Sequence, residues 1–273
     1  MRPTVPAVLA GPGGRGPELR RALAAAGHPV DRHNALARLA DALSALSLAH
    51  VPRVAIDGPD AAGKTTFANE LAVLISARRP VVRLGSDDFH RPAGARYRRG
   101  DMSPEGYYLD SFDNEMIVAA VLHPLGPGGG GEYLAAAFDY RSGRPVAGRR
   151  RIADPAALLL FDGVFLQRRE LREHWDAVIY LHVAPEESLR RALIRDRGLL
   201  GSDEIILARY SGRYLPGQVL YRGADHPVDR ADTVLDMTDP ARPVLLRCRG
   251  EVLGPATWSE PGDDQRTRAG RQP

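Results

Sequence analysis

The stretch Arg53-Val54-Ala55-Ile56-Asp57-Gly58-Pro59-Asp60-Ala61-Ala62-Gly63-Lys64-Thr65-Thr66 decides the fold of this 273-residue chain. From Gly58 to Thr65 it fits the pattern G-x-x-x-x-G-K-S/T at every fixed position, and Lys64 is the only lysine in the chain. In such a loop the lysine acts as a compact point charge on the β- and γ-phosphates, inside a ring of backbone N–H groups that a planar guanidinium does not fit. The motif predicts that the chain binds a nucleoside triphosphate.

The residues on both sides of the loop support this prediction. Residues 53–57 form a short β-branched run typical of a strand, and residues 65–75 carry apolar side chains at helical spacing. The loop N–H groups and the positive end of the helix would then converge on the bound anion, and the Thr65 hydroxyl would lie where Mg²⁺ binds. A glycine-rich turn that matches by accident is the alternative. We expect the following residues to bind the nucleotide: Gly58, Asp60, Ala61, Ala62, Gly63, Lys64, Thr65 and Thr66.

Composition excludes several classes of protein. A hydrophobic content of 44% and a charged content of 26% are typical of a soluble globular protein, and the length allows one or two domains. The single cysteine, Cys248, excludes an internal disulfide and suits a reducing cytoplasm, where we expect the protein. No apolar run is long enough to span a membrane. The net charge of +3 is mild, and the arginines are scattered along the sequence and form no basic stripe. We therefore expect no nucleic-acid or membrane partner.

Strands and helices alternate along the chain, which predicts an α/β fold with a parallel sheet covered on both faces. We expect a flexible segment with leading helices over residues 1–50, the main domain over 51–253, and a disordered tail over 254–273. A β-hairpin over residues 133–152 is inserted after a glycine-rich hinge. The further expected strands are 80–85, 157–161, 177–183 and 233–237, and the further expected helices are 17–26, 35–47, 110–122, 186–197 and 203–214.

A second glycine pattern, residues 11–16, matches G-x-G-x-x-G and is followed 20 residues after Gly11 by Asp31, as a dinucleotide site would require. Pro12 lies inside the would-be turn, and the preceding strand signal is weak. We therefore expect no dinucleotide site here.

Acidic residues end two of the expected strands. Asp162 follows an apolar strand, as expected of a carboxylate on the metal side. Asp87 and Asp88 follow another, at the sheet edge where ligands bind in such folds. Asp87 is the candidate general base and Asp88 the candidate cap of the next segment. The alternative is that these acids are turn or capping residues only.

Arginines gather on the expected helix 186–197. Arg191 and Arg195 are four residues apart on one face, so two guanidinium groups could reach the same phosphates. A solvated helix face is the alternative, because Glu186, Glu187 and Asp196 could pair with these arginines.

The sequence resembles the uridine kinase-like branch of P-loop kinases, which includes nicotinamide riboside kinases and phosphoribulokinases. The resemblance runs from about Arg53 to Met237 and implies a five-stranded parallel sheet, ATP with Mg²⁺ as donor, and transfer of the γ-phosphoryl group to a primary hydroxyl. It assigns Asp87 as base, Thr65 and Asp162 to the metal side, and Arg191 and Arg195 as lid arginines. The motifs that carry it are Gly58–Thr65, Ser86-Asp87-Asp88-Phe89-His90-Arg91-Pro92, Asp110-Ser111-Phe112-Asp113-Asn114-Glu115, Phe161-Asp162-Gly163 and Arg191…Arg195-Asp196.

The chain departs from this family on the acceptor side. Tyr107 stands where uridine kinases place an aspartate for the ribose hydroxyls, and Phe138 and Gly143 stand where they place the tyrosine and histidine that read uracil. The family's usual glutamate is Asp162 here. His90 and Tyr108 could compensate. The expected substrate-binding residues are Asp87, His90, Tyr107, Tyr108 and Phe138. Discrimination among bases should be poor, because hydrogen bonds to buried partners carry most such selectivity.

The sequence thus predicts an ATP- and Mg²⁺-dependent small-molecule kinase, with Asp87, Lys64, Arg191 and Arg195 as catalytic residues. The favoured acceptor is the 5′-hydroxyl of a nucleoside such as uridine. The alternatives are nicotinamide riboside, pantothenate or a sugar phosphate as acceptor, or a nucleotide-binding protein that transfers no phosphoryl group.

Overall fold

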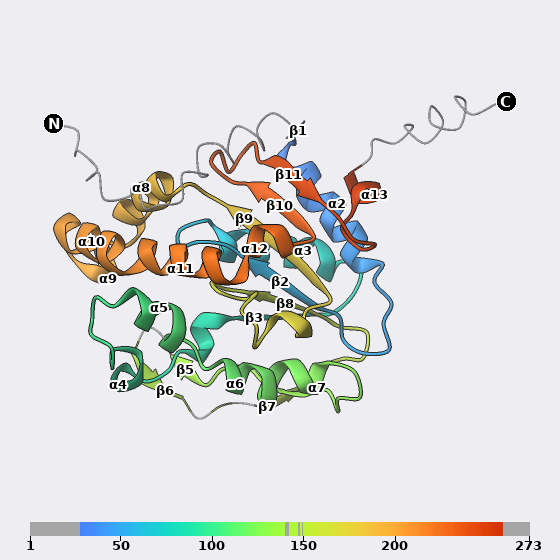
Figure 1. Cartoon of the computed structure of the whole chain (residues 1–273). Coiled ribbons are helices and arrows are strands. Elements are labelled where there is room, and N and C mark those ends of the chain that lie inside the picture. Colours follow the sequence, from blue (N-terminus) through green and yellow to red (C-terminus); the bar gives the residue numbers. More distant parts are fainter. Residues whose placement is uncertain (1–27, 140–141, 147, 149, 259–273) are drawn as a thin grey trace.

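A seven-stranded sheet runs through the middle of the molecule, as the computed structural model in Figure 1 shows. The model describes residues 28–139, 142–146, 148 and 150–258. The strand order is β1-β11-β10-β9-β2-β8-β3. The strands are β1 (His28–Pro29), β2 (Arg53–Asp57), β3 (Val81–Gly85), β8 (Leu158–Asp162), β9 (Ala177–His182), β10 (Thr233–Asp236) and β11 (Val244–Cys248).

Five neighbouring strands, β10, β9, β2, β8 and β3, are parallel, which confirms the expected α/β fold. Beyond them, β11 pairs antiparallel with β10, and β1 pairs antiparallel with β11. Neither of these two strands was predicted. The parallel arrangement brings the carboxyl ends of the central strands, and the loops that follow them, to one edge of the sheet.

Side chains alternate between the two faces of the sheet, because successive residues of a strand point in opposite directions. Val54 and Ile56 of β2 join the buried cluster on one face, and Ala55 joins the cluster on the other. In β8, Leu160 and Phe161 divide in the same way. Both faces are therefore apolar, as expected for a parallel sheet covered on both sides.

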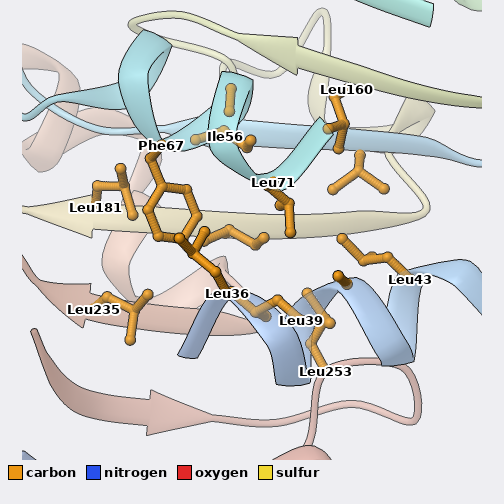
Figure 2. Close-up of a cluster of buried hydrophobic side chains, with 14 of the residues drawn as sticks. Leu36, Leu39, Leu43, Ile56, Phe67, Leu71, Leu160, Leu181, Leu235 and Leu253 are labelled. Carbon is orange, nitrogen blue, oxygen red and sulfur yellow. The ribbon is translucent and has the colours of Figure 1, made fainter. Parts of the chain in front are cut away.

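The first face is covered by α2 (Arg32–Ser44) and α3 (Lys64–Ser76), whose leucines point at the strands in Figure 2. Leu39 of α2 and Leu71 of α3 are fully buried there, beside Phe67. Helix α3 begins inside the phosphate-loop motif, so its packing on the sheet holds the loop in place.

The second face is covered by a broken helical segment. The sequence predicted one helix over residues 110–122, but α5 ends at Asp110 and the next helix begins only at Asn114. The Asp113 carboxylate accepts a hydrogen bond from the Met116 N–H and caps that helix. The helical elements between β3 and β8 are η2 (Ser86–Phe89), α4 (Ala93–Arg96), α5 (Pro104–Asp110), α6 (Asn114–Ile117), η3 (Val118–Leu122) and α7 (His123–Leu125), and η4 (Arg172–His174) lies between β8 and β9.

Two short antiparallel strand pairs follow, where the sequence predicted an inserted hairpin. β4 (Glu132–Leu134) pairs with β7 (Arg150–Ile152), and β5 (Phe138–Asp139) pairs with β6 (Arg144–Pro145). The Ala137 N–H donates to the Asp88 carbonyl, which places β5 beside the segment that follows β3.

The helices after β9 form a separate small cluster around Leu189, Ile206 and Tyr210. The expected helices 186–197 and 203–214 are present with shifted ends, whereas α11 was not predicted. The bounds are α8 (Pro185–Arg195), α9 (Arg197–Leu200), α10 (Asp203–Arg209), η5 (Tyr210–Tyr214), α11 (Leu215–Asp225), α12 (Pro227–Arg230) and α13 (Pro255–Trp258).

The glycine pattern at 11–16 and the expected helix 17–26 lie outside the described residues. Asp31, the acid that would have served a dinucleotide site, accepts hydrogen bonds from the N–H groups of His33 and Asn34 and caps α2. Among the helices of the described part, none combines the length and the apolar character needed to cross a membrane.

Candidate active site

The loop between β2 and α3 needs its two motif glycines for different reasons. A Cβ on Gly58 would lie 2.4 Å from the carbonyl oxygen of Leu181, so close approach of two backbones excludes any side chain there. A Cβ on Gly63 would meet nothing within 4 Å, but this residue has φ of +85° and supplies a left-handed turn at the start of α3. Together they form a loop that opens onto the N-terminus of a helix, which favours a bound anion.

Lys64 lies across this loop. Its Nζ donates to the Pro59 carbonyl oxygen at 2.7 Å. Burial lowers the pKa of the ammonium, and the charges of Asp60, Asp162, Asp57 and Asp87 oppose that shift. The charges of four carboxylates therefore act on a single ammonium. A triphosphate that entered the loop would add further negative charge, which favours a buried cation.

The metal-side residues predicted from the sequence lie together. The Thr65 hydroxyl donates to Asp162 Oδ2 at 2.7 Å, which joins the start of α3 to the end of β8. The other carboxylate oxygen, Oδ1, accepts a hydrogen bond from Arg83, whose Nε donates to Asn69 Oδ1. Hydroxyl and carboxylate oxygens are ligands that Mg²⁺ prefers, and one or two protein ligands suffice where phosphates and water supply the rest. The donor set thus fits Mg²⁺.

Asp57 is a buried acid that the sequence reading passed over. It is fully buried at the end of β2 and accepts hydrogen bonds from the Gly58 N–H, the Tyr221 hydroxyl and the Gln167 amide. Burial raises its pKa, and these hydrogen bonds lower it in part. The contacts tie the first residue of the loop to α11, which carries Tyr221.

Asp60, inside the loop, is held by contacts from three other helices. The Tyr107 hydroxyl of α5 donates to both of its carboxylate oxygens, at 2.8 and 2.9 Å, and Gln218 of α11 donates to one of them at 3.2 Å. The Ser188 hydroxyl of α8 donates to the Asp60 carbonyl. Tyr107 was expected to contact substrate. The structure gives its buried hydroxyl a partner in the loop instead, and a substrate role for it stays a prediction.

Asp87 and His90 lie just after β3. The Asp87 side chain is 71% exposed, and His90 Nε2 lies 3.5 Å from its Oδ1. Desolvation raises the pKa of Asp87, but the hydrogen bond and charge of His90, with the charges of Lys64 and Arg195, outweigh it and hold the pKa below its usual value. Asp87 is therefore an ionised, accessible carboxylate on which the charge of Lys64 acts. Asp88, by contrast, accepts from the Gly85 N–H at 3.3 Å, as expected of a cap.

Aromatic side chains hold His90 in place. Its ring stacks on Phe112 at 4.5 Å between centroids, and Phe138 of β5 meets it edge-on at 5.9 Å. Phe138 is buried, as a wall residue would be. Tyr108 points elsewhere, because its hydroxyl donates to Asp225 of α11. The structure thus brings Asp87, His90 and Phe138 together and leaves Tyr108 apart.

The two expected lid arginines have different surroundings. Arg191 bonds Glu187, the carbonyls of Met237 and Thr238, and the carbonyl of Ala61 in the loop at 3.4 Å. Arg195 bonds Asp196 and the Tyr210 hydroxyl, and its charge acts on Asp87 and Asp60. Both are close to the loop, and both have protein partners that a bound nucleotide would have to compete with.

Two hollows among the described residues lie at the opposite edge of the sheet. One, of about 660 Å³, lies against Arg53 and His174, and the other, of about 260 Å³, against Trp175 and Asp232. Arg53 begins β2, whereas the phosphate loop follows its end. Neither hollow belongs to the candidate active site.

The geometry can support transfer of a phosphoryl group. An anion-binding loop with an ammonium, an oxygen pair suited to Mg²⁺ and an exposed carboxylate lie within reach of one another. The sequence named all three parts in advance, and their roles stay predictions. It missed the supporting residues Asp57, Tyr221, Gln218 and Arg83, because their roles depend on contacts between segments far apart in the chain.

No family model and no curated protein matches the chain, but solved structures do. A candidate uridine kinase from Bacillus stearothermophilus is 22% identical with a TM-score of 0.56, over 80% of this chain and 98% of that one. A candidate fructose transport system kinase from Silicibacter sp. TM1040 is 25% identical with a TM-score of 0.59, over 70% and 95% of the two chains. The resemblance to uridine kinase-like P-loop kinases is confirmed at the level of the fold.

Proposed function

We propose that the protein is an ATP-dependent kinase that transfers the γ-phosphoryl group to a hydroxyl of a small molecule. The observation that carries the proposal is the Thr65–Asp162 hydrogen bond at the loop of the buried Lys64, with the accessible carboxylate of Asp87 near enough for its charge to act on that ammonium. The kinase fold of two similar structures supports the same class of reaction.

In this proposal the backbone N–H groups of residues 60–65 and Lys64 hold the β- and γ-phosphates, and Thr65 and Asp162 would hold Mg²⁺. When bound, the metal neutralises charge on the phosphates. The acceptor hydroxyl oxygen forms a bond to the γ-phosphorus while the bond to the bridging oxygen of ADP breaks. Asp87 accepts the hydroxyl proton, and Arg191 and Arg195 neutralise charge in the loose transition state.

The low pKa of Asp87 suits this role in one respect, since the group is ionised throughout the neutral range. A carboxylate of that kind is a weak base. It can serve in phosphoryl transfer because the hydroxyl loses its proton late, after much of the bond to the leaving group has broken.

The nucleoside acceptor favoured by the sequence has less support. Tyr107, in the position of the family's ribose-binding aspartate, donates its hydroxyl to Asp60. One similar structure is named as a uridine kinase and the other as a fructose transport system kinase, so the shared fold does not select an acceptor. We retain a hydroxyl-bearing small molecule as the acceptor class.

The test is Asp87→Asn, with Asp88→Asn as the matched control. We expect the first variant to lose ATP-dependent transfer to any acceptor that the wild type phosphorylates, while its ATP affinity stays close to wild type. The control should retain transfer, because Asp88 caps the turn after β3 and is not the proposed base. Unchanged turnover in Asp87→Asn would remove it as the base, and ATP binding without transfer to any acceptor would favour a nucleotide-binding protein.

A further inference from the structure

Arg96, the last residue of α4, has no anionic partner among the residues that the structure describes. Its guanidinium lies over the rings of Tyr97 and Phe138, with 5.4 and 5.3 Å from Cζ to the centroids. Its Nε is buried and has no hydrogen-bond partner in the described part of the chain. Neighbouring Arg98 and Arg99 differ, since each bonds an oxygen of Asp110. A half-buried guanidinium over aromatic faces retains donors for a ligand.

A continuous series of contacts connects Arg96 to the candidate base. Arg96 lies on Phe138, Phe138 meets the edge of the His90 ring, and His90 Nε2 is 3.5 Å from Asp87. The backbone supports this arrangement, because β5, which carries Phe138, is hydrogen-bonded to Asp88 through Ala137. Arg96 is therefore three contacts away from the carboxylate that would meet the acceptor hydroxyl.

A second series connects Arg96 to the phosphate loop. Arg213 donates to the Arg96 carbonyl and lies over the rings of Tyr97 and Tyr107, and Tyr107 reaches Asp60 in the loop. Arg96 thus lies between two contact paths, one ending at the base and the other at the nucleotide loop. This is where the part of an acceptor remote from its reacting hydroxyl would lie.

The charge around Arg96 is positive and poorly balanced. Arg213 is only 2% exposed, and its hydrogen bonds go to carbonyl oxygens of residues 96, 100, 101 and 103. No carboxylate pairs with it among the described residues. Two buried or half-buried guanidinium groups without acids favour a ligand that carries negative charge.

The acids that could bind the hydroxyls of a neutral sugar are already engaged. Both oxygens of Asp110 accept from arginines, and both oxygens of Asp60 accept from Tyr107. Arg96 and Arg213 remain without a carboxylate partner among the described residues. A neutral nucleoside requires carboxylates that accept hydrogen bonds from its hydroxyls, whereas the groups without a partner here are guanidinium groups.

We propose that Arg96 binds an anionic group, a phosphate or a carboxylate, on the acceptor, so that the substrate is an anionic hydroxy compound. This proposal rests on the proposed kinase function. A guanidinium binds either group through two parallel N–H···O hydrogen bonds, which would orient the acceptor with its hydroxyl toward Asp87. Arg213 acts as a positioning residue that fixes the backbone of Arg96.

The experiment measures binding, so that it does not depend on turnover. The full chain, saturated with Mg²⁺ and a non-hydrolysable ATP analogue, is titrated calorimetrically with matched neutral and anionic compounds. The pairs are glycerol and glycerate, and fructose and fructose 6-phosphate, with uridine as the neutral nucleoside. The carboxylate and phosphate pairs separate the two sources of charge. The variants are Arg96→Gln and, as control, Arg169→Gln, which removes a charge from a side chain that is 81% exposed.

We expect an anionic compound to bind wild type and Arg169→Gln more tightly than its neutral partner, and to lose about tenfold or more in affinity in Arg96→Gln, as for a charge-assisted hydrogen bond. Preference for uridine or for the neutral members, equal affinity in Arg96→Gln, or no binding of either anionic compound would overturn the proposal. Circular dichroism of Arg96→Gln checks that it folds, and Arg96→Lys, which keeps the charge, should bind at an intermediate level. Failure of the ATP analogue to bind would instead count against the kinase function.

Discussion

Replacing Tyr107 by Phe removes one hydroxyl and leaves its ring in place. That hydroxyl donates to both oxygens of Asp60, and the ring packs edge-on against Phe165 and Tyr214, each at 4.9 Å between centroids. A hydrogen bond to a charged group contributes about 1.5–3 kcal/mol. Since Gln218 still donates to Asp60 in the variant, we expect a loss near 1.5 kcal/mol in the free energy of unfolding.

For a chain of this length such a loss lowers the midpoint of thermal unfolding by roughly 3–6 °C. Because Asp60 lies in the phosphate loop, part of the same energy should appear as weaker binding of ATP, up to about tenfold. The acceptor KM should not change. Differential scanning calorimetry and a calorimetric ATP titration measure the two effects.

Tyr108→Phe is the matched control. Its hydroxyl also donates to a carboxylate, that of Asp225, but the contact lies away from the loop. We expect it to lower stability and leave ATP affinity unchanged. If Tyr107→Phe raised the acceptor KM and left ATP affinity at the wild-type value, Tyr107 would be a substrate-binding residue and the assignment to the loop would be wrong.

Two further predictions concern stability. Leu71→Ala opens a cavity in the cluster of Figure 2, where this side chain is fully buried. We expect urea unfolding to show a loss of about 2–5 kcal/mol in the free energy of unfolding, and a loss under about 1 kcal/mol would contradict this prediction. Hydrogen bonds from Arg190 and Arg191 lower the pKa of Glu187 from 4.5, its value in the unfolded chain, to about 2. The ionised carboxylate therefore stabilises the fold at pH values above 4.5, and this stabilisation is lost as the pH falls toward 2. Glu187→Gln should therefore be less stable than wild type from pH 7 to 5, with the gap narrowing below pH 4.5; urea midpoints at pH 7, 5 and 3 that differ by the same amount would contradict this.

The parts of the fold that follow a local pattern could be predicted. The strand 53–57 and the phosphate loop depend on residues adjacent in sequence, and the structure has that strand with the predicted ends. The α2 helix was expected at 35–47 but spans Arg32–Ser44, because Asp31 caps it three residues earlier. The predicted helix 110–122 is helical from Asn114 on, and only its start was wrong. Asp113 fits the periodic run in the sequence, but its side chain caps a new helix that begins at the next residue.

The rest depends on contacts that no local pattern encodes. Strand β11 pairs antiparallel beside β10, and its sequence carries no signal of that direction. Tyr107 has the residue type of a substrate reader, yet its partner Asp60 is 47 residues away. Tyr221 reaches Asp57 across 164 residues. Such pairings place the supporting residues of the site, which is why the motif residues could be named in advance and their neighbours could not.

The central claim is that the ammonium of Lys64 and the main-chain N–H groups of its loop together bind a nucleoside triphosphate. Calorimetric titration of wild type and Lys64→Ala with ATP and Mg²⁺ tests it most directly. The account predicts saturable binding by wild type and a loss of about 10- to 150-fold in the variant, as for a charge-assisted contact. A wild-type protein that binds neither ATP nor GTP, or a variant that binds as tightly as wild type, would contradict it.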